Sequence, residues 1–283
     1  MNAKKNWCHR TRGTRYALAL SIAVLLGVAA CSSQRPFVPT WQSPAGTNIC
    51  QLSDAEKAVA TGIFARLKPD IDKRRRQGTH VTLSFQELYA GLDQKESAFL
   101  TALRNTKPGT VGVKTPYLGC DSSGARLVRL EESFTNAMGV KVDIPPQYLP
   151  EPVWQQYEAM MEAMQRDLGR RLYVTSGYRS GAYQLYLFLG YLPKHGWSVQ
   201  ETARFVALPG YSEHGDVSRQ ALDFVNSDNI ADQPGQFEKL PEFKWLGEHA
   251  GRFGFALSYP PNSPTGISFE PWHWHAKDRS SER

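Results

Sequence analysis

The chain has 283 residues and a net charge of +6, from 33 basic and 27 acidic side chains. Five of the basic residues and no acidic residue lie in the first 30 positions, so the remainder carries a charge of +1 (28 minus 27). The positive charge therefore does not support a nucleic-acid-binding function, and we expect no nucleic-acid partner. The roughly 250 residues that follow can form one large domain or two small ones.

Residues 1–30 have the pattern of a secretory signal peptide. A basic stretch precedes an apolar run at residues 16–30, which is too short and too rich in alanine to predict a membrane span. The run ends in Leu-Gly-Val-Ala-Ala before Cys31, which resembles a bacterial lipobox, although an ordinary signal peptide with a chance cysteine would look similar. We expect lipidation of Cys31, a flexible tether over residues 31–48 and, because serine follows the cysteine, a periplasmic protein anchored to the outer membrane.

Two cysteines, Cys50 and Cys120, lie beyond the predicted lipid site. A secreted protein matures in an oxidising compartment, so we expect these two thiols to form a disulfide rather than to stay free. Neither has another cysteine two or three positions away, which argues against a metal site built from cysteines.

Residues 49–125 are predicted to form a helical accessory lobe. Three segments, residues 53–56, 84–87 and 93–96, have a serine or an aspartate three positions before a glutamate, which is the capping-box pattern of a helix start. Behind the first box, apolar residues recur every four positions, as on the buried face of a helix. No residue pattern in this lobe indicates a chemistry.

Residues 145–278 alternate between helices and short strands. Strands are predicted from β-branched and aromatic residues at positions 172–175, 221–225 and 268–274. Helices are predicted from apolar periodicity at positions 153–168, 182–192, 199–207 and 241–253. This order predicts an α+β fold in which helices flank a small antiparallel sheet, with the helical lobe at its N-terminal side.

Histidines and carboxylates cluster at two places in this second region. His214 and His273 each lie within a few residues of a carboxylate, and Asp223 belongs to a strand predicted to be buried. A buried aspartate needs a charged partner, and a metal is the strongest one available. Two imidazoles and one carboxylate leave one position open, as a catalytic zinc requires. Asp216 is an alternative ligand, but it lacks the strand context.

Two further residues suit a hydrolytic site. Glu270 lies three residues before His273, where it could take the proton of a zinc-bound water, whose pKa is roughly 7, and pass it to a leaving amine. Arg179 follows a predicted strand in a glycine-containing turn, where it could bind a carboxylate or an oxyanion, although an exposed turn is an equal alternative. The chain has neither an HExxH helix nor a GxSxG elbow, which excludes a thermolysin-type site and weakens a serine-hydrolase interpretation.

Three motifs together resemble those of one known family. Residues 176–180 read Ser-Gly-Tyr-Arg-Ser with Gln184 one helical turn on, residues 212–223 contain Ser-x-His and Ala-x-Asp, and residues 270–274 read Glu-Pro-Trp-His-Trp. This set resembles the VanY-type zinc D-Ala-D-Ala carboxypeptidases, in the wider group that holds VanX dipeptidases and LAS-type peptidoglycan endopeptidases. The resemblance covers about residues 150–277 and leaves out the helical lobe.

The resemblance implies a role for each matching residue. The ligands of Zn²⁺ would be His214, Asp223 and His273. The catalytic residues would be Glu270, as the base, and Arg179, which would bind the substrate and stabilise the transition-state charge. The residues of the substrate site would be Tyr178, Ser180, Gln184 and Ser212.

Two features depart from the family pattern. His214 and Asp223 are nine positions apart instead of seven, and Arg219 stands where the pattern has glycine. We expect the two extra residues to form a bulge that leaves both ligands anchored. His275 stands where the family usually has arginine, and it would be either a group behind the metal ligands or an exposed side chain.

The sequence thus predicts a lipid-anchored zinc metallopeptidase, with its peptidase domain at residues 145–278, that trims terminal D-alanine from peptidoglycan stem peptides. We expect a monomer that is bound to the membrane through Cys31. A peptidoglycan endopeptidase or dipeptidase of the same fold is one alternative. A non-catalytic wall-binding lipoprotein is another, and the lengthened segment between His214 and Asp223 is its main support.

Overall fold

The structure, a computed structural model, describes residues 50–120, 124–231, 233 and 235–277. The predicted signal peptide, lipidation site and tether, residues 1–48, lie outside the described residues. All described residues belong to one compact unit. Within them, no helix has the length and the apolar character that a membrane crossing requires.

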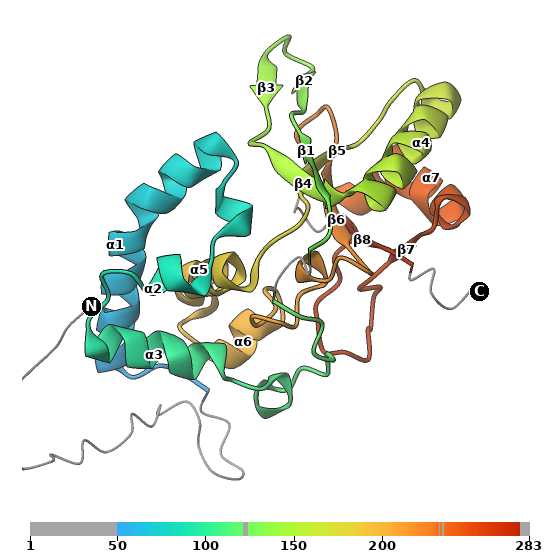
Figure 1. The fold of residues 1–283 in the computed structure, drawn as a ribbon. Helices are drawn as coiled ribbons and strands as arrows, with labels where there is room; N and C mark the ends of the chain where they lie inside the picture. Colours follow the sequence, from blue (N-terminus) through green and yellow to red (C-terminus); the bar gives the residue numbers. More distant parts are fainter. Residues whose placement is uncertain (1–49, 121–123, 232, 234, 278–283) are drawn as a thin grey trace, which may run out of the picture. The chain divides into compact units, whose positions relative to one another are not determined.

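Seven α-helices and eight strands make up the described part of the chain (Figure 1). The helices are α1 (Asp54–Gln77), α2 (Phe85–Tyr89), α3 (Gln94–Arg104), α4 (Glu151–Leu168), α5 (Gly181–Tyr191), α6 (Val199–Ala203) and α7 (Pro241–His249). The strands are β1 (Leu127–Leu130), β2 (Ser133–Thr135), β3 (Lys141–Asp143), β4 (Gln147–Pro150), β5 (Tyr173–Ser176), β6 (Ala221–Val225), β7 (Phe255–Leu257) and β8 (His273–Ala276). Short 3-10 helices are η1 (His80–Thr82), η2 (Pro108–Val111), η3 (Leu192–His195), η4 (Glu213–Gly215), η5 (Phe237–Lys239) and η6 (Ala250–Phe253).

The N-terminal helices begin where the capping boxes predict. In each of α1, α2 and α3 the box glutamate, which is Glu56, Glu87 or Glu96, accepts a hydrogen bond from the backbone N–H of the N-cap residue. The three helices pack with α5 around one hydrophobic core, which includes Ile63 of α1 and Phe188 of α5. The helical lobe is therefore packed against α5, a helix of the predicted peptidase domain.

A four-stranded antiparallel sheet with the order β5-β6-β8-β7 forms the other half of the fold. Its apolar side chains pack with α4 and α7 in a second hydrophobic core, where the rings of Tyr157 on α4 and Phe224 on β6 stack. The predicted α+β fold, with a small antiparallel sheet flanked by helices, is confirmed. The register of this sheet places Asp223 directly opposite His273.

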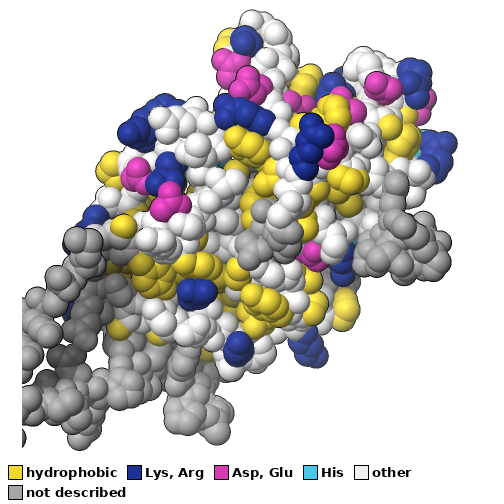
Figure 2. Space-filling model, in the orientation of Figure 1, with side chains coloured by type: hydrophobic (Ala, Val, Ile, Leu, Met, Phe, Trp, Pro, Cys, Tyr) yellow, Lys and Arg dark blue, Asp and Glu magenta, His cyan; other side chains and the backbone are white. Residues whose placement is uncertain are grey.

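Two more antiparallel pairs, β1 with β4 and β2 with β3, precede α4 in a segment for which the sequence patterns predicted no element. Basic and acidic side chains lie close together over the β2-β3 hairpin (Figure 2), where Lys141 Nζ is 2.7 Å from Asp143 Oδ1. The charges of the hairpin therefore offset one another, in keeping with the low net charge of the chain beyond residue 30.

Two predicted helices are shorter in the structure. The helix predicted at residues 199–207 ends as α6 at Ala203, where the backbone N–H groups of Arg204 and Phe205 donate to residues three positions earlier and tighten the last turn. The helix predicted at residues 241–253 changes to the 3-10 helix η6 after His249, and it ends at Gly254, whose φ of +82° suits glycine.

The predicted disulfide between Cys50 and Cys120 is wrong, because both cysteines are free. Cys50 Sγ lies 3.8 Å from the carbonyl oxygen of Thr110. Cys120 Sγ instead lies 3.7 Å from the hydroxyl group of Tyr117, and it packs against the backbone of Gly181 at the start of α5. The two thiols thus contact different segments, and burial raises the pKa of the Cys50 thiol, which keeps it protonated.

Candidate metal centre

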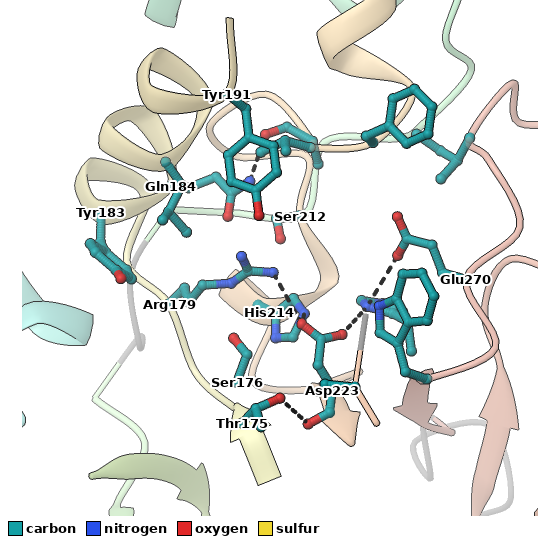
Figure 3. A pocket seen from close by; sticks show the side chains of 18 of the residues that line it. Thr175, Ser176, Arg179, Tyr183, Gln184, Tyr191, Ser212, His214, Asp223 and Glu270 are labelled. Atoms are coloured by element: carbon teal, nitrogen blue, oxygen red, sulfur yellow. Dashed lines mark hydrogen bonds and ion pairs between the residues drawn. The ribbon is translucent and has the colours of Figure 1, made fainter. Parts of the chain in front are cut away.

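The sheet register brings two of the predicted ligands together. Asp223 on β6 is the cross-strand partner of His273 on β8, and His273 Nδ1 lies 2.8 Å from Asp223 Oδ1. The third predicted ligand, His214, lies in η4, with Nε2 3.1 Å from Asp223 Oδ2 (Figure 3). Each of the three residues offers one ligand atom, and these atoms lie within 4.8 Å of one another.

His214 is prepared to bind a metal through Nε2. Its Nδ1–H donates to the carbonyl oxygen of Gly177 at 2.7 Å, so Nδ1 carries the proton and Nε2 has a free lone pair. Nε2 is buried and, although it is close to Asp223, it has no hydrogen-bond partner in the described residues. Burial, assisted by the charge of Arg179, lowers the pKa of His214 to about 4, so the imidazole is neutral as a ligand must be.

His273 is held between two carboxylates. Its Nε2–H donates to Glu213 Oε2 at 3.1 Å, while Nδ1 faces Asp223. Burial lowers the pKa of His273, but the carboxylates of Asp223 and Glu213 outweigh burial and raise the pKa to about 10. The surroundings therefore favour a positive charge beside Nδ1. A carboxylate on the outer nitrogen is the usual way in which a metal-binding histidine is oriented.

Asp223 completes a donor set that fits a zinc ion. Burial alone would raise the pKa of Asp223, but the imidazoles of His214 and His273 outweigh burial and hold the pKa well below its ordinary value. Two imidazole nitrogens and one carboxylate, with the orphaned Nε2 of His214 among them, are the ligands of many catalytic zinc sites. These residues would hold the ion, and all three line a cavity that a substrate could enter.

The longer segment between His214 and Asp223 folds away from the ligands. Asp216, the alternative ligand, accepts hydrogen bonds from the backbone N–H and the hydroxyl of Ser218, so it closes a local turn. Arg219 turns back, and its Nη2 lies 3.0 Å from Glu213 Oε1, which joins the loop to the carboxylate behind His273. The two extra residues therefore leave the ligand set intact.

Glu270 is the carboxylate nearest to the three ligands on the cavity side. The strand predicted at residues 268–274 begins only at His273, because Pro271 has no N–H and the N–H of His273 closes a turn onto the carbonyl oxygen of Glu270 at 3.1 Å. This turn places Glu270 Oε2 3.7 Å from His273 Nδ1. Burial raises the pKa of Glu270 to about 8, so the group can accept and hold a proton near neutral pH.

Arg179 places a positive charge on the other side of the ligands. Its backbone N–H donates to the carbonyl oxygen of His214 at 2.9 Å, which fixes the turn after β5. The guanidinium group points into the cavity, with Nη2 3.9 Å from Asp223 Oδ2 (Figure 3). Its Nε is buried without a hydrogen-bond partner in the described part of the chain, and it is therefore available to a ligand.

A cavity of about 670 Å³ opens beside these residues. Two of the predicted substrate-site residues, Gln184 and Ser212, line it. The other two, Tyr178 and Ser180, do not line it. Ser180 instead caps α5 and donates through Oγ to the carbonyl oxygen of Leu83 at 2.6 Å, while Tyr178 is buried and its backbone N–H donates to Tyr148.

The sequence patterns indicated no role for Glu213 and Tyr259, which both contact His273. Tyr259 is buried, with its ring centroid 4.9 Å from that of His273. His275 is one of the groups behind the metal ligands, since its Nε2 lies 3.3 Å from Arg219 Nη2 and its Nδ1 2.8 Å from Ser258 Oγ. The position of Glu213 next to His214 was the one signal that could have indicated its role. The candidate metal ligands and the carboxylate of Glu270 line one cavity, as the residues of a metal-dependent hydrolase site do.

Comparison with known proteins finds similarity over the second half of the chain. Residues 146–276 match the VanY family, described as D-alanyl-D-alanine carboxypeptidase. A D-alanyl-D-alanine carboxypeptidase of Enterococcus faecium is 32% identical over 129 residues, which are 44% of this chain and 36% of that protein. The bifunctional D-Ala-D-Ala dipeptidase and carboxypeptidase VanXYC of Enterococcus gallinarum is 31% identical over 131 residues, 45% of this chain and 66% of that protein. Residues 146–276 are therefore similar to VanY-type D-alanyl-D-alanine carboxypeptidases.

The match leaves out the helical segment before residue 146, and it spans only part of each curated relative. Among solved structures, VanYB in complex with D-alanine-D-alanine has a TM-score of 0.40 and 25% identity, covering 58% of this chain and 84% of that chain. The LdcB LD-carboxypeptidase has a TM-score of 0.45 and 23% identity, covering 62% of this chain and 79% of that chain.

Proposed function

We propose that this chain is a zinc-dependent D,D-carboxypeptidase that removes terminal D-alanine from peptidoglycan stem peptides. The observation that carries the proposal is the pairing of β6 with β8, which holds Asp223 and His273 together beside Glu270 and an open cavity. The VanY match over residues 146–276 supports the choice of a D-alanyl peptide as the substrate.

Each side chain of the site would have a separate role in the reaction. His214, Asp223 and His273 would hold the zinc ion. When bound there, zinc supplies a Lewis acid and lowers the pKa of a water molecule to roughly 7. Arg179 would bind the peptide carboxylate or the developing oxyanion, because its guanidinium group faces the cavity. Glu270 would take a proton at Oε2 and pass it to the leaving amine, since burial raises its pKa to about 8.

The direct test uses the purified chain without residues 1–30, zinc and a pentapeptide that ends in D-Ala-D-Ala. We expect release of one D-alanine per peptide, loss of release with a chelator and recovery with added zinc. Release of the D-Ala-D-Ala dipeptide would indicate a dipeptidase, and cleavage of muropeptide crosslinks without D-alanine release would indicate an endopeptidase. Binding to sacculi without any hydrolysis would favour a wall-binding protein.

We further propose that the protein is periplasmic, monomeric and anchored to the outer membrane by a lipid on Cys31. The support is the sequence of the first 32 residues, with its basic start, apolar run and lipobox-like end. The wild type should incorporate labelled palmitate and sediment with outer-membrane vesicles. A Cys31→Ser variant should lose both properties, and sedimentation of the label with the inner membrane would contradict the proposed location.

A further inference from the structure

The turn that carries Arg179, residues 177–180, joins β5 to α5 and is held by segments outside itself. The backbone N–H groups of four consecutive residues, 178 to 181, each donate to a carbonyl oxygen in a different segment of the chain. The acceptors are Tyr148 at 2.7 Å, His214 at 2.9 Å, Val81 at 2.8 Å and Cys120 at 2.9 Å. Val81 and Cys120 belong to the helical lobe and lie outside residues 146–276. The lobe therefore accepts two of these four hydrogen bonds.

Ser180 is also bound to the lobe through its side chain. Its Oγ–H donates to the carbonyl oxygen of Leu83 at 2.6 Å, and Oγ accepts from the backbone N–H of Tyr183 at 3.2 Å. Val81 and Leu83 are buried, and hydrogen bonds away from water are costly to lose. The ring of His80, the first residue of η1, meets the ring of Tyr183 edge-on, with centroids 4.8 Å apart. The segment from His80 to Leu83 thus holds both the end of the turn and the first turn of α5.

Gly181, the first residue of α5, lies against Cys120 too closely for a side chain. A Cβ at Gly181 would lie 2.8 Å from Cys120 Sγ, 2.9 Å from its Cβ and 3.3 Å from its Cα. These distances are shorter than the roughly 3.5–4.0 Å of an ordinary contact. The close approach lets the N–H of Gly181 reach the carbonyl oxygen of Cys120.

The segment that ends at Cys120 also contacts two other loops of the site. The backbone N–H of Leu118 donates at 2.7 Å to the carbonyl oxygen of Gly210, in the loop that leads to η4. The backbone N–H of Lys114 donates at 2.7 Å to the carbonyl oxygen of Thr265, in the loop between β7 and β8. Residues 114–120 of the lobe therefore lie beside the loops that lead to His214 and Glu270 as well as beside the turn of Arg179.

The side chain of Arg179 makes few contacts that would fix its direction independently of the backbone. Its Nη2 lies 3.9 Å from Asp223 Oδ2, which is longer than a hydrogen bond. Its Nε has no hydrogen-bond partner among the described residues. The direction in which the guanidinium group enters the cavity (Figure 3) therefore depends on the conformation of the turn.

We propose that η1 and residues 114–120 of the helical lobe hold Arg179 where it binds the substrate, and that Ser180 and Gly181 are the positioning residues through which they act. The inference rests on the proposed function, which supplies the carboxylate or oxyanion that Arg179 binds. A displacement of about 1 Å can cost on the order of 10²-fold in rate, so the hold on the turn contributes to catalysis. The helical lobe, which has no chemical motif of its own, thereby becomes part of the peptidase site.

The first test removes the hydroxyl group that binds Leu83. Ser180→Ala should lower kcat/KM for release of D-alanine about 10- to 100-fold, because the turn loses a hydrogen bond to the lobe. Ser198→Ala is the matched control, since Ser198 caps α6 by accepting from the N–H of Glu201 at 3.1 Å and does not line the cavity. Both variants lose a helix cap and should unfold about 2–4 °C earlier, but Ser198→Ala should keep the kcat/KM of the wild type.

The second test acts on the contact between α5 and the lobe from both sides. Gly181→Ala should lower kcat/KM about tenfold or more, because the added Cβ pushes α5 away from Cys120. Alanine is the better helix former, so a weaker helix would not explain this loss. Cys120→Gly removes the two atoms nearest to the added Cβ and keeps the carbonyl acceptor. The double variant Gly181→Ala/Cys120→Gly should therefore recover most of the lost activity.

A double-mutant cycle shows whether Ser180 acts through Arg179. Arg179→Gln removes the guanidinium group, so Ser180→Ala should lower kcat/KM much less in this background than in the wild type. A purely structural serine would have the same effect in both backgrounds. Dissociation constants of the peptide, measured in a Glu270→Gln background, report the same coupling without turnover.

The outcomes separate the positioning role from the proposed function. Wild-type kcat/KM in Ser180→Ala, or an equal effect of this change with and without Arg179, would overturn the positioning role and leave the carboxypeptidase in place. A loss in Gly181→Ala that Cys120→Gly does not recover would contradict the role of the lobe. If no peptide is cleaved, but Ser180→Ala weakens peptide binding only when Arg179 is present, the positioning role stands and the proposed function fails.

Discussion

At one end of the cavity, Asp223 and His273 are cross-strand partners in the sheet, and their separation follows from the backbone hydrogen bonds of β6 and β8. On the helical part of the cavity wall, Arg75 of α1 and Lys194 of η3 are exposed side chains, and their positions depend on how the helices pack around α5. His214 and His273 are almost fully buried, whereas both cations reach solvent. The paired strands suit a site that must hold an ion, because their hydrogen bonds position the side chains more precisely than helix packing positions exposed ones.

The largest expected effect comes from a variant that removes the proposed catalytic base and keeps all three candidate metal ligands. Glu270→Gln keeps the shape of the side chain but cannot take a proton, so kcat for D-alanine release should fall about 10²- to 10⁴-fold. Zinc affinity, measured by competition with a chromophoric chelator, should stay close to the wild-type value because Glu270 is not among the three ligands. Full activity of this variant would contradict the assignment of the base.

The next effect tests whether Glu213 and Arg219 orient His273. Glu213 accepts from His273 Nε2, and Arg219 holds Glu213 at 3.0 Å. Glu213→Gln or Arg219→Gln should weaken zinc binding about 10- to 100-fold, as the loss of an outer partner of a metal-binding histidine does. Arg126→Gln is the control, because Arg126 forms an exposed ion pair with Glu151 away from the cavity. Equal zinc affinity in all three variants would remove Glu213 and Arg219 from the metal centre.

The buried His80, which follows α1 and lines the cavity, should make the stability of the protein depend on pH. Burial lowers the pKa of His80 to about 4, below its ordinary value of 6.5, so the unfolded chain takes up this proton at a higher pH than the folded chain. The contribution to stability is complete above pH 6.5, decreases as pH falls towards 4, and levels off below that, with a total loss of about 2–3 kcal/mol.

The measurement for this test is urea unfolding between pH 4 and pH 7, with a chelator present so that metal release does not contribute. The free energy of unfolding of wild type should fall more steeply towards acid than that of His80→Gln, and the difference between the two slopes isolates the histidine. Parallel slopes would show that His80 does not hold its neutral form in the folded chain.

The smallest effect concerns the contact of α1 with α5. A Cβ at Gly190 would lie 2.5 Å from Cε2 of Phe64, whose ring stacks on Tyr186. Gly190→Ala should therefore lower the free energy of unfolding by about 1 kcal/mol, even though alanine favours the helix. In the control Gly247→Ala on α7 the added Cβ meets open space. This change should raise the free energy of unfolding by about 0.5–1 kcal/mol. If both variants gained stability, the close packing of α1 on α5 would be refuted.

The candidate ligand set could be predicted from the sequence because His214, Asp223 and His273 lie in short motifs whose combination of imidazoles and carboxylates is typical of a zinc site. The strand around Asp223 was also predictable, since residues 221–225 are apolar on both sides of the carboxylate. Its register with β8 was not, because the pairing of distant strands depends on the rest of the sheet.

Other features depend on contacts that sequence patterns do not contain. Ser180 matched a substrate-site motif, yet its hydroxyl caps α5 because the chain turns there towards Leu83. The disulfide prediction rested on the expected compartment and had no information on the distance between Cys50 and Cys120, which contact different segments. The contribution of Arg75 to the cavity arises only from the packing of α1 on α5.

The central claim is that the sheet register creates a zinc site with one open position beside Glu270. Crystals grown with one equivalent of zinc, with diffraction measured on both sides of the zinc absorption edge, test it most directly. The account predicts a single anomalous peak about 2.0–2.2 Å from His214 Nε2, His273 Nδ1 and a carboxylate oxygen of Asp223. An ion bound through Asp216 in place of Asp223, or no peak between the three residues, would contradict it.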